Sequence, residues 1–121
     1  MMTRILIVDD TFFIRETIKR MIDGEDFTVV GEADNGQDAV NLYRELQPDI
    51  VTMDITMPLK NGLEATKEIC DAFPEAKILM ITAVGQQKNV ITALENGAKD
   101  FMTKPFTQER LVETLKRLVE V

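Results

Sequence analysis

The chain contains no histidine and a single cysteine, Cys70, among its 121 residues. Without histidine it can neither use imidazole for acid or base catalysis nor build a Ser/His/Asp triad. One cysteine alone can form neither an internal disulfide nor a cysteine-rich zinc site. Any chemistry must therefore depend on carboxylates, lysine, hydroxyl groups or a bound metal ion.

Long apolar segments and an excess of positive charge are missing as well. The apolar run near the N-terminus is too short for a signal peptide or a membrane span, and it has no small-residue cleavage site. The 14 Lys and Arg are outnumbered by 21 Asp and Glu, and the resulting net charge of -7 repels nucleic acid. We therefore expect a cytoplasmic protein that binds no nucleic acid and does not insert into a membrane.

Short apolar runs alternate with amphipathic stretches along the sequence, without a flexible linker between them. A chain of 121 residues is long enough for one core and too short for two, so we expect a single domain over residues 1–121. The alternation predicts repeated βα units that form a parallel sheet with helices on both faces. The expected strands cover residues 4–9, about 28–32, 50–54, 77–82 and 100–103.

Residues that start and stop helices occur between these strands. Asn35, Asn61 and Thr107 precede amphipathic stretches and are predicted N-caps, whereas Gly24 and Gly97 are predicted to end helices. In the last helix the predicted buried stripe consists of Leu111, Leu115, Leu118 and Val119.

Five βα units can close a good core as an open, doubly wound α/β sheet. Right-handed crossovers require the strand order to reverse once, and ligands bind at that reversal. We take the order 2-1-3-4-5 by analogy with flavodoxin-like folds, where the first and third strands are neighbours.

Four of the predicted strands stop at polar residues, which are Asp9 with Asp10, Asp54, Thr82 and Lys104. Because parallel strands end at the same edge of a sheet, these side chains are expected to meet there. Three clustered carboxylates repel one another unless they are protonated or joined by a cation. An all-oxygen set suits Mg²⁺, and the backbone carbonyl of Thr56 is a candidate fourth ligand.

Lys104 is followed by Pro105, and an X-Pro bond adopts the cis form far more readily than other peptide bonds. We predict a cis Lys104–Pro105 bond that directs Lys104 toward the cleft, where its ammonium group can contact a phosphoryl oxygen. Thr82 is a candidate hydroxyl donor to the same group, and Phe101 a candidate switch that turns inward when Thr82 moves. Taken singly, each of these residues also has an ordinary structural explanation, such as strand packing or a solvated surface charge.

As a set, these residues resemble the receiver domain of two-component response regulators over essentially the whole chain. The motifs that carry the resemblance are Asp9-Asp10, Asp54, Thr82, Lys104-Pro105, the DITMP sequence that includes Asp54, and the NG that opens the third helix. The chain is most similar to stand-alone members that act in chemotaxis, and we expect no output domain.

The resemblance implies a signalling protein that catalyses only its own Mg²⁺-dependent phosphorylation and dephosphorylation. Asp54 would accept the phosphoryl group from a phosphohistidine on a histidine kinase, and Lys104 would contact that group. Thr82 and Phe101 would then shift and change the surface of the fourth helix, fifth strand and fifth helix. The implied partners are a chemoreceptor kinase, the flagellar motor switch and a phosphatase, and the protein is expected to be a monomer.

Three alternative functions have different sequence requirements. A stand-alone phosphorelay or sporulation-type receiver would share every site residue, with the exposed face of the fourth helix, Lys88, Ile91, Thr92 and Glu95, binding another target. A Mg²⁺-dependent phosphohydrolase of the haloacid dehalogenase type needs a second Asp where this chain has Thr56. A flavodoxin-like electron carrier needs a Ser-, Thr- and Gly-rich loop where this chain has Asp9-Asp10-Thr11.

Overall fold

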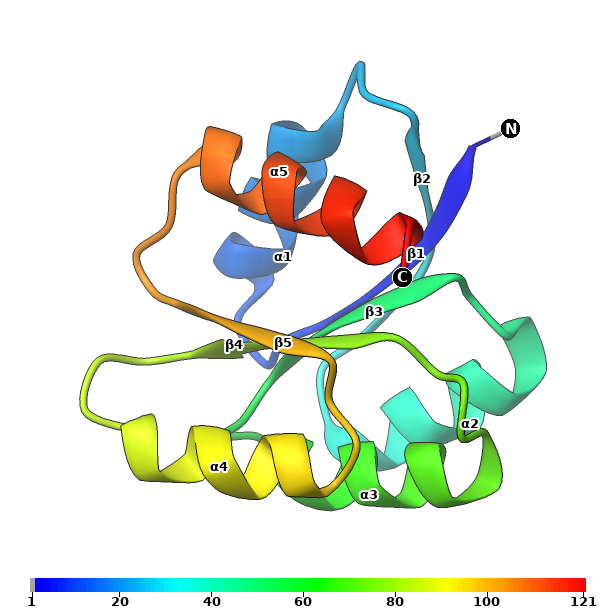
Figure 1. Ribbon diagram of the computed structural model, residues 1–121, viewed down its shortest axis with the longest axis vertical. Helices are drawn as coiled ribbons and strands as arrows, with labels where there is room; N and C mark the ends of the chain where they lie inside the picture. The colour runs from blue at the N-terminus through cyan, green and yellow to red at the C-terminus, as the bar shows by residue number, and fades with distance from the viewer. Residues whose placement is uncertain (1) are drawn as a thin grey trace.

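Five parallel strands form one central sheet with helices on both faces in the computed structural model, which describes residues 2–121 (Figure 1). The strands are β1 (Thr3–Val8), β2 (Phe27–Ala33), β3 (Ile50–Asp54), β4 (Ile78–Thr82) and β5 (Asp100–Thr103). The helices are α1 (Phe12–Ile22), α2 (Gly36–Leu46), α3 (Gly62–Ala72), α4 (Gln87–Glu95) and α5 (Gln108–Val119). The strand order is β2-β1-β3-β4-β5, which confirms the predicted doubly wound α/β fold.

The central strands are buried on both faces because helices cover both sides of the sheet. Figure 1 shows α1 and α5 on one face and α2, α3 and α4 on the other. Side chains alternate between the two layers, so that Leu6 and Val8 of β1 pack toward α2 and α3 while Ile5 and Ile7 pack toward α1 and α5. This two-sided burial explains the unbroken apolar runs in the sequence.

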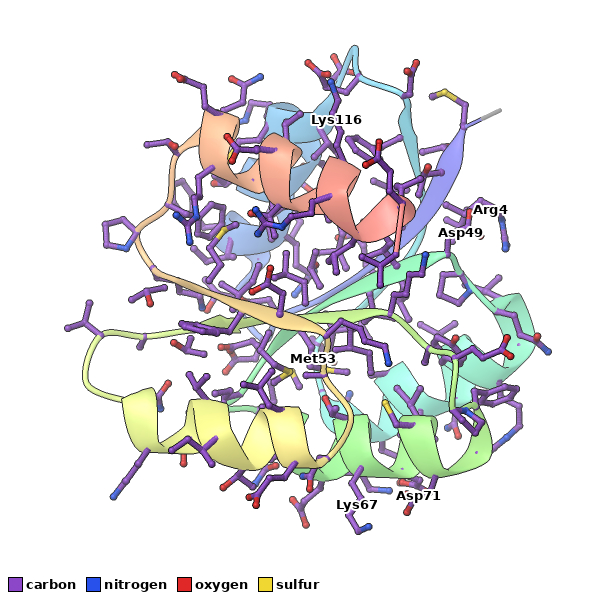
Figure 2. The ribbon with its side chains drawn as sticks, viewed as in Figure 1. Arg4, Asp49, Met53, Lys67, Asp71 and Lys116 are labelled. Atoms are coloured by element: carbon purple, nitrogen blue, oxygen red, sulfur yellow. The ribbon has the colours of Figure 1, made fainter. Side chains whose placement is uncertain are left out.

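Apart from the buried Asp9 and Asp54, the charged side chains of residues 2–121 lie at least partly outside these layers. Figure 2 shows Met53 of β3 inside the layer of α2, α3 and α4, whereas Lys67 and Asp71 project outward from α3 and pair at 3.2 Å. Within residues 2–121, every helix is too short or too polar to cross a bilayer.

Three of the five strand predictions need correction by a residue or more. β1 runs one residue earlier than expected and ends at Val8, so Asp9 lies just past the strand. β4 begins at Ile78 instead of residue 77, and β2 is longer than predicted, covering Phe27–Ala33. β2 is an edge strand, and its register against β1 shifts between Ile5 and Leu6. Partly exposed edge strands carry a weaker apolar pattern, which explains the short prediction.

The three predicted N-caps are confirmed. The side chains of Asn35, Asn61 and Thr107 accept hydrogen bonds from the backbone N–H groups of residues three positions on, at 2.8, 2.9 and 3.1 Å. The prediction that Val119 belongs to the buried stripe of α5 is wrong, because Val119 is 44% exposed. Leu118 takes the core position, and Val119, at the end of α5, lines the same surface hollow as Met2.

Gly62 begins α3 in close contact with the end of β3. Its N–H donates to the carbonyl of Ile55 at 2.7 Å, and a Cβ atom at Gly62 would lie 1.9 Å from the carbonyl oxygen of Asp54. Both atoms of that clash are fixed by backbone structure, so neither can move aside easily. Glycine at this position therefore sets where the end of β3 can lie.

Gly62→Ala should lower the free energy of unfolding by roughly 3 kcal/mol or more, because the clash must displace backbone. Gly24→Ala is the matched control: Gly24 has φ of 84° and open space around it, so alanine there should cost only about 1 kcal/mol. Urea unfolding of both variants measures the difference. Equal losses would contradict the close contact at Gly62.

Candidate functional site

The predicted site residues meet at the carboxyl edge of the sheet, where the strand order reverses. β1 pairs with both β2 and β3, and Val8 lies opposite Met53 in the ladder. Asp9 and Asp10 follow Val8, while Asp54 is the last residue of β3. Strand pairing therefore brings these carboxylates together although Asp9 and Asp54 are 45 positions apart in the sequence.

Asp9 is the most enclosed of the three carboxylates, with 1% exposure. One oxygen, Oδ1, accepts from the backbone N–H of Thr11 at 2.9 Å, and Oδ2 accepts from Lys104 Nζ at 3.0 Å. Its backbone is also fixed, because its carbonyl accepts from Arg15 Nη1 at 2.7 Å and its N–H donates to Ala33. Asp9 is therefore held in one orientation by contacts with several elements.

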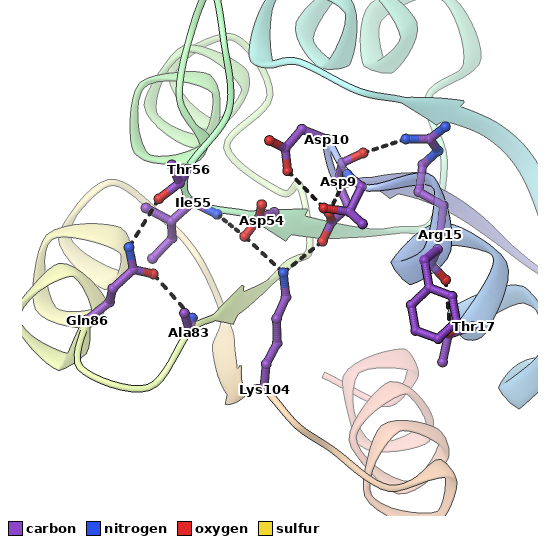
Figure 3. Close-up of polar contacts among 12 residues, drawn as sticks. Asp9, Asp10, Arg15, Thr17, Asp54, Ile55, Thr56, Ala83, Gln86 and Lys104 are labelled. Carbon is purple, nitrogen blue, oxygen red and sulfur yellow. Dashed lines mark hydrogen bonds and ion pairs between the residues drawn. The ribbon is translucent and has the colours of Figure 1, made fainter.

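Asp10 is exposed, and within residues 2–121 its side chain is held only by a long contact of 3.5 Å from Thr11 Oγ1 to its Oδ1 (Figure 3). Its carboxylate is free to turn toward a ligand.

Asp54 is 7% exposed, and the ammonium group of Lys104 lies between its carboxylate and that of Asp9 (Figure 3). Its Oδ1 accepts from the backbone N–H of Ile55 at 2.9 Å and from Lys104 Nζ at 3.4 Å. Burial, followed by the negative charge of Asp9, raises the pKa of Asp54 to about 6 despite the opposing charge of Lys104. An ionised Asp54 is therefore costly until further positive charge reaches it.

Lys104 follows β5 and extends its ammonium group into the acidic cluster. Its backbone N–H donates to the carbonyl of Thr82 at 2.7 Å, and the Lys104–Pro105 bond is cis. Burial lowers the pKa of Lys104, but the hydrogen bond to Asp9 and the charges of Asp54 and Asp9 outweigh it and raise the pKa above its usual value. Lys104 is therefore a fixed positive charge shared by two carboxylates.

The three carboxylates fit a divalent cation. One oxygen from each of Asp9, Asp10 and Asp54 lies within 4.8 Å of the others. At such separations each pair of negative charges repels by roughly 3 kcal/mol or more at an effective dielectric constant of about 20. A single lysine leaves the cluster with net negative charge, and the all-oxygen donor set is the type that Mg²⁺ prefers.

The remaining predicted residues surround this centre. Thr82 is 2% exposed at the end of β4, next to the strand that carries Asp54. Thr56 is exposed in the loop after β3, and Phe101 on β5 is 38% exposed, with its ring partly in solvent. All of the predicted residues thus lie at the carboxyl ends of the strands or on β5, the outermost strand on that side of the sheet.

Sequence reasoning missed three residues that hold this arrangement. Thr11 and Arg15 orient Asp9, and Gln86 donates through Nε2 to Thr56 Oγ1 at 3.1 Å (Figure 3). Each of these types is common on a helix or loop surface, so nothing in the sequence sets them apart. Their hydrogen-bond partners become evident only from the way the loops are placed in the folded structure.

Comparison with known proteins gives consistent matches over nearly the whole chain. Residues 5–116 match the response regulator receiver domain family. The chain is 53% identical to the chemotaxis protein CheY of Thermotoga maritima, over 95% of this chain and 96% of that protein.

Two solved structures share the fold. The response regulator domain of Thermotoga maritima CheB has a TM-score of 0.91 and 37% identity, covering 100% of this chain and 98% of the other. CheY in the CheX-CheY-BeF3-Mg²⁺ complex from Borrelia burgdorferi has a TM-score of 0.91 and 31% identity. The match covers 96% of this chain and 88% of the other. The sheet order and the placement of its helices therefore have counterparts among receiver structures.

Asp54→Asn should stabilise the metal-free protein at neutral pH. The pKa of Asp54 rises from 3.8 to about 6 on folding, so ionisation disfavours the folded state. The wild type should therefore lose stability relative to the variant as the pH rises from about 4 to above 6, reaching a difference of about 2 to 3 kcal/mol. Urea unfolding in the presence of a chelator, measured across this range, gives the two curves.

Asp26→Asn is the control for this experiment, because it removes one exposed carboxylate outside the cluster. Its pH curve should run parallel to that of the wild type. A parallel curve for Asp54→Asn as well would show that burial and the charge of Asp9 do not raise the pKa of Asp54.

Proposed function

The chain belongs to the response regulator receiver domain family, and we propose that within it residues 1–121 act as one phosphoaspartate switch in chemotaxis. Asp54 accepts a phosphoryl group from a phosphohistidine on a histidine kinase, and the protein then changes its α4, β5 and α5 surface. The observation that carries this proposal is the position of Asp54 beside one lysine and two further carboxylates at the strand-order reversal.

The hydrogen-bond pattern of Asp54 indicates which oxygen attacks. Among residues 2–121, the donors to its carboxylate, Ile55 N–H and Lys104 Nζ, both reach Oδ1. Oδ2 thus keeps its electron pairs for the phosphorus atom. The new O–P bond forms as the P–N bond of the phosphohistidine breaks, and the electron pair of that bond returns to the imidazole of the donor.

Asp9, Asp10 and Asp54, with the backbone carbonyl of Thr56, would hold Mg²⁺ at this site. When bound, Mg²⁺ supplies positive charge that offsets the carboxylates and the phosphoryl oxygens. Thr11 and Arg15 keep Asp9 oriented for this role through its Oδ1 and its carbonyl.

Lys104 and Thr82 respond to the phosphoryl group. Lys104 Nζ, which lies 3.4 Å from Asp54 Oδ1, has to turn only a short way to reach a phosphoryl oxygen. The Thr82 hydroxyl donates to another, and Phe101 rotates into the space that Thr82 leaves. These movements alter a face whose exposed residues include Lys88, Ile91, Thr92 and Glu95 of α4.

The partners follow from this role. The kinase is the phosphodonor, and similarity to the chemotaxis protein CheY of Thermotoga maritima supports the flagellar motor switch as the target. The Borrelia burgdorferi structure, in which CheY is in a complex with CheX, BeF3 and Mg²⁺, supports Mg²⁺ and a further protein as partners.

Acetyl phosphate with Mg²⁺ should add one phosphoryl group to the wild type and none to Asp54→Asn. The reason is that only Asp54 combines a free oxygen with a neighbouring lysine and metal site. Intact-protein mass spectrometry measures the addition. Asp34→Asn, which changes an exposed carboxylate at the same edge, should be labelled like the wild type, and equal labelling of all three proteins would refute the assignment.

Mg²⁺ should raise the thermal stability of the wild type, since it binds the folded cluster. At about 100 times its dissociation constant it should add about 2.7 kcal/mol. Asp10→Asn should lose most of this gain while folding normally, because Asp10 is exposed and has only the long contact with Thr11. Thermal melts with and without Mg²⁺ test this, and an undiminished gain in Asp10→Asn would place the ion elsewhere.

A further inference from the structure

The side chain of Gln86 joins the two loops that follow β3 and β4. Its Nε2 donates to Thr56 Oγ1 at 3.1 Å, and its Oε1 accepts from the backbone N–H of Ala83 at 3.2 Å (Figure 3). The backbone N–H of Gln86 also donates to the carbonyl of Ala83, at 3.2 Å. One amide group therefore ties Ala83, which follows Thr82 directly, to Thr56, which lies two residues beyond Asp54.

Gln86 occupies the N-cap position of α4 but makes no side-chain hydrogen bond to the helix. In α2, α3 and α5 the N-cap side chains do bond to their own helices. Leaving α4 without such a cap lowers the stability of its first turn. The Gln86 amide is instead committed to the loops that border Asp54.

Elsewhere α4 is held by few polar contacts. At its C-terminal end Asn96 Nδ2 donates to the carbonyl of Leu63 at 3.0 Å, which fixes that end against α3. Val90 and Ala93 are buried, whereas Ile91 is 65% exposed on the outer face. A side-chain amide therefore anchors each end of α4: Gln86 at the N-terminal end and Asn96 at the C-terminal end.

We propose that Gln86 is a positioning residue that holds the β4–α4 loop in its resting place and opposes the switch. This inference rests on the proposed function, in which Thr82 moves toward a phosphoryl oxygen on Asp54. Because Ala83 is bonded covalently to Thr82, that movement carries the Ala83 N–H away from Gln86 Oε1. The amide of Gln86 has a fixed size and cannot follow Ala83 while it keeps Thr56.

Activation must therefore break at least one of the two side-chain hydrogen bonds of Gln86. A neutral hydrogen bond shifts an equilibrium by about twofold to tenfold. Removing the link should favour the active arrangement to a similar extent, and a ligand that selects this arrangement should bind more tightly.

Beryllofluoride with Mg²⁺, a mimic of the phosphoryl group, is the probe, and its dissociation constant can be measured by fluorine NMR. Gln86→Met keeps the length of the side chain but removes both hydrogen bonds, and Thr56→Val removes the hydroxyl but keeps the backbone carbonyl. Each variant should bind the probe about twofold to tenfold more tightly than the wild type. The double variant should gain little more, because both changes break the same link.

Lys67→Ala is the control, since Lys67 projects outward from α3 and pairs only with Asp71 among the described residues. It should bind beryllofluoride like the wild type. Equal affinities of the wild type, Gln86→Met and Thr56→Val would overturn the role of Gln86 and leave the phosphoacceptor intact. A wild type that does not bind the probe at all would overturn the proposed function.

Hydrogen exchange at the Ala83 amide provides a readout that needs no phosphoryl mimic. In the unliganded protein, Gln86→Met should expose this N–H and speed its exchange severalfold, while exchange at the buried amide of Met53 stays unchanged. Unchanged exchange at Ala83 would overturn the link whatever the affinities show.

Discussion

The ion pairs of Lys104 with Asp9 and Asp54 are the contacts on which the site depends. The ammonium group lies 3.0 Å from one carboxylate and 3.4 Å from the other, in a cluster that includes a third, Asp10. One positive charge offsets only part of the repulsion, and burial adds to the cost. The resting protein therefore holds a local excess of negative charge that a divalent cation can offset.

The rest of the fold keeps these charges close to one another despite their repulsion. β1 and β3 are paired and buried on both faces, which fixes the backbone from which Asp9 and Asp54 extend. Gly62 allows α3 to start directly against the end of β3, and the capping box of Asn61 and Glu64 fixes that start. The loop after β4 has no comparable packing. Its position depends on the hydrogen bonds of Gln86, so the loop that we propose to move is held by few contacts.

Much of the fold could be predicted from the sequence because parallel strands that are buried on both faces leave unbroken apolar runs. The same regularity placed Asp54, Thr82 and Lys104 at strand ends, on one edge. The sheet order came from analogy, since chain periodicity does not specify which strands are neighbours. Helical spacing also does not show how wide the buried face of a helix is, which is why Val119, next to the buried Leu118 in α5, was wrongly placed in the core. Gln86 could not be predicted, because its bond to Thr56 spans 30 residues and depends on how two loops approach each other.

The central claim is that Asp54 takes a phosphoryl group from phosphohistidine, and direct identification of the modified residue tests it. A phosphorylated histidine kinase domain would be mixed with the protein and Mg²⁺, and the acyl phosphate reduced with borohydride, which converts a phosphorylated aspartate to homoserine. Peptide mass spectrometry then locates the homoserine. The account predicts homoserine at position 54 alone. Homoserine at another aspartate, or none while phosphoryl transfer proceeds, would contradict it.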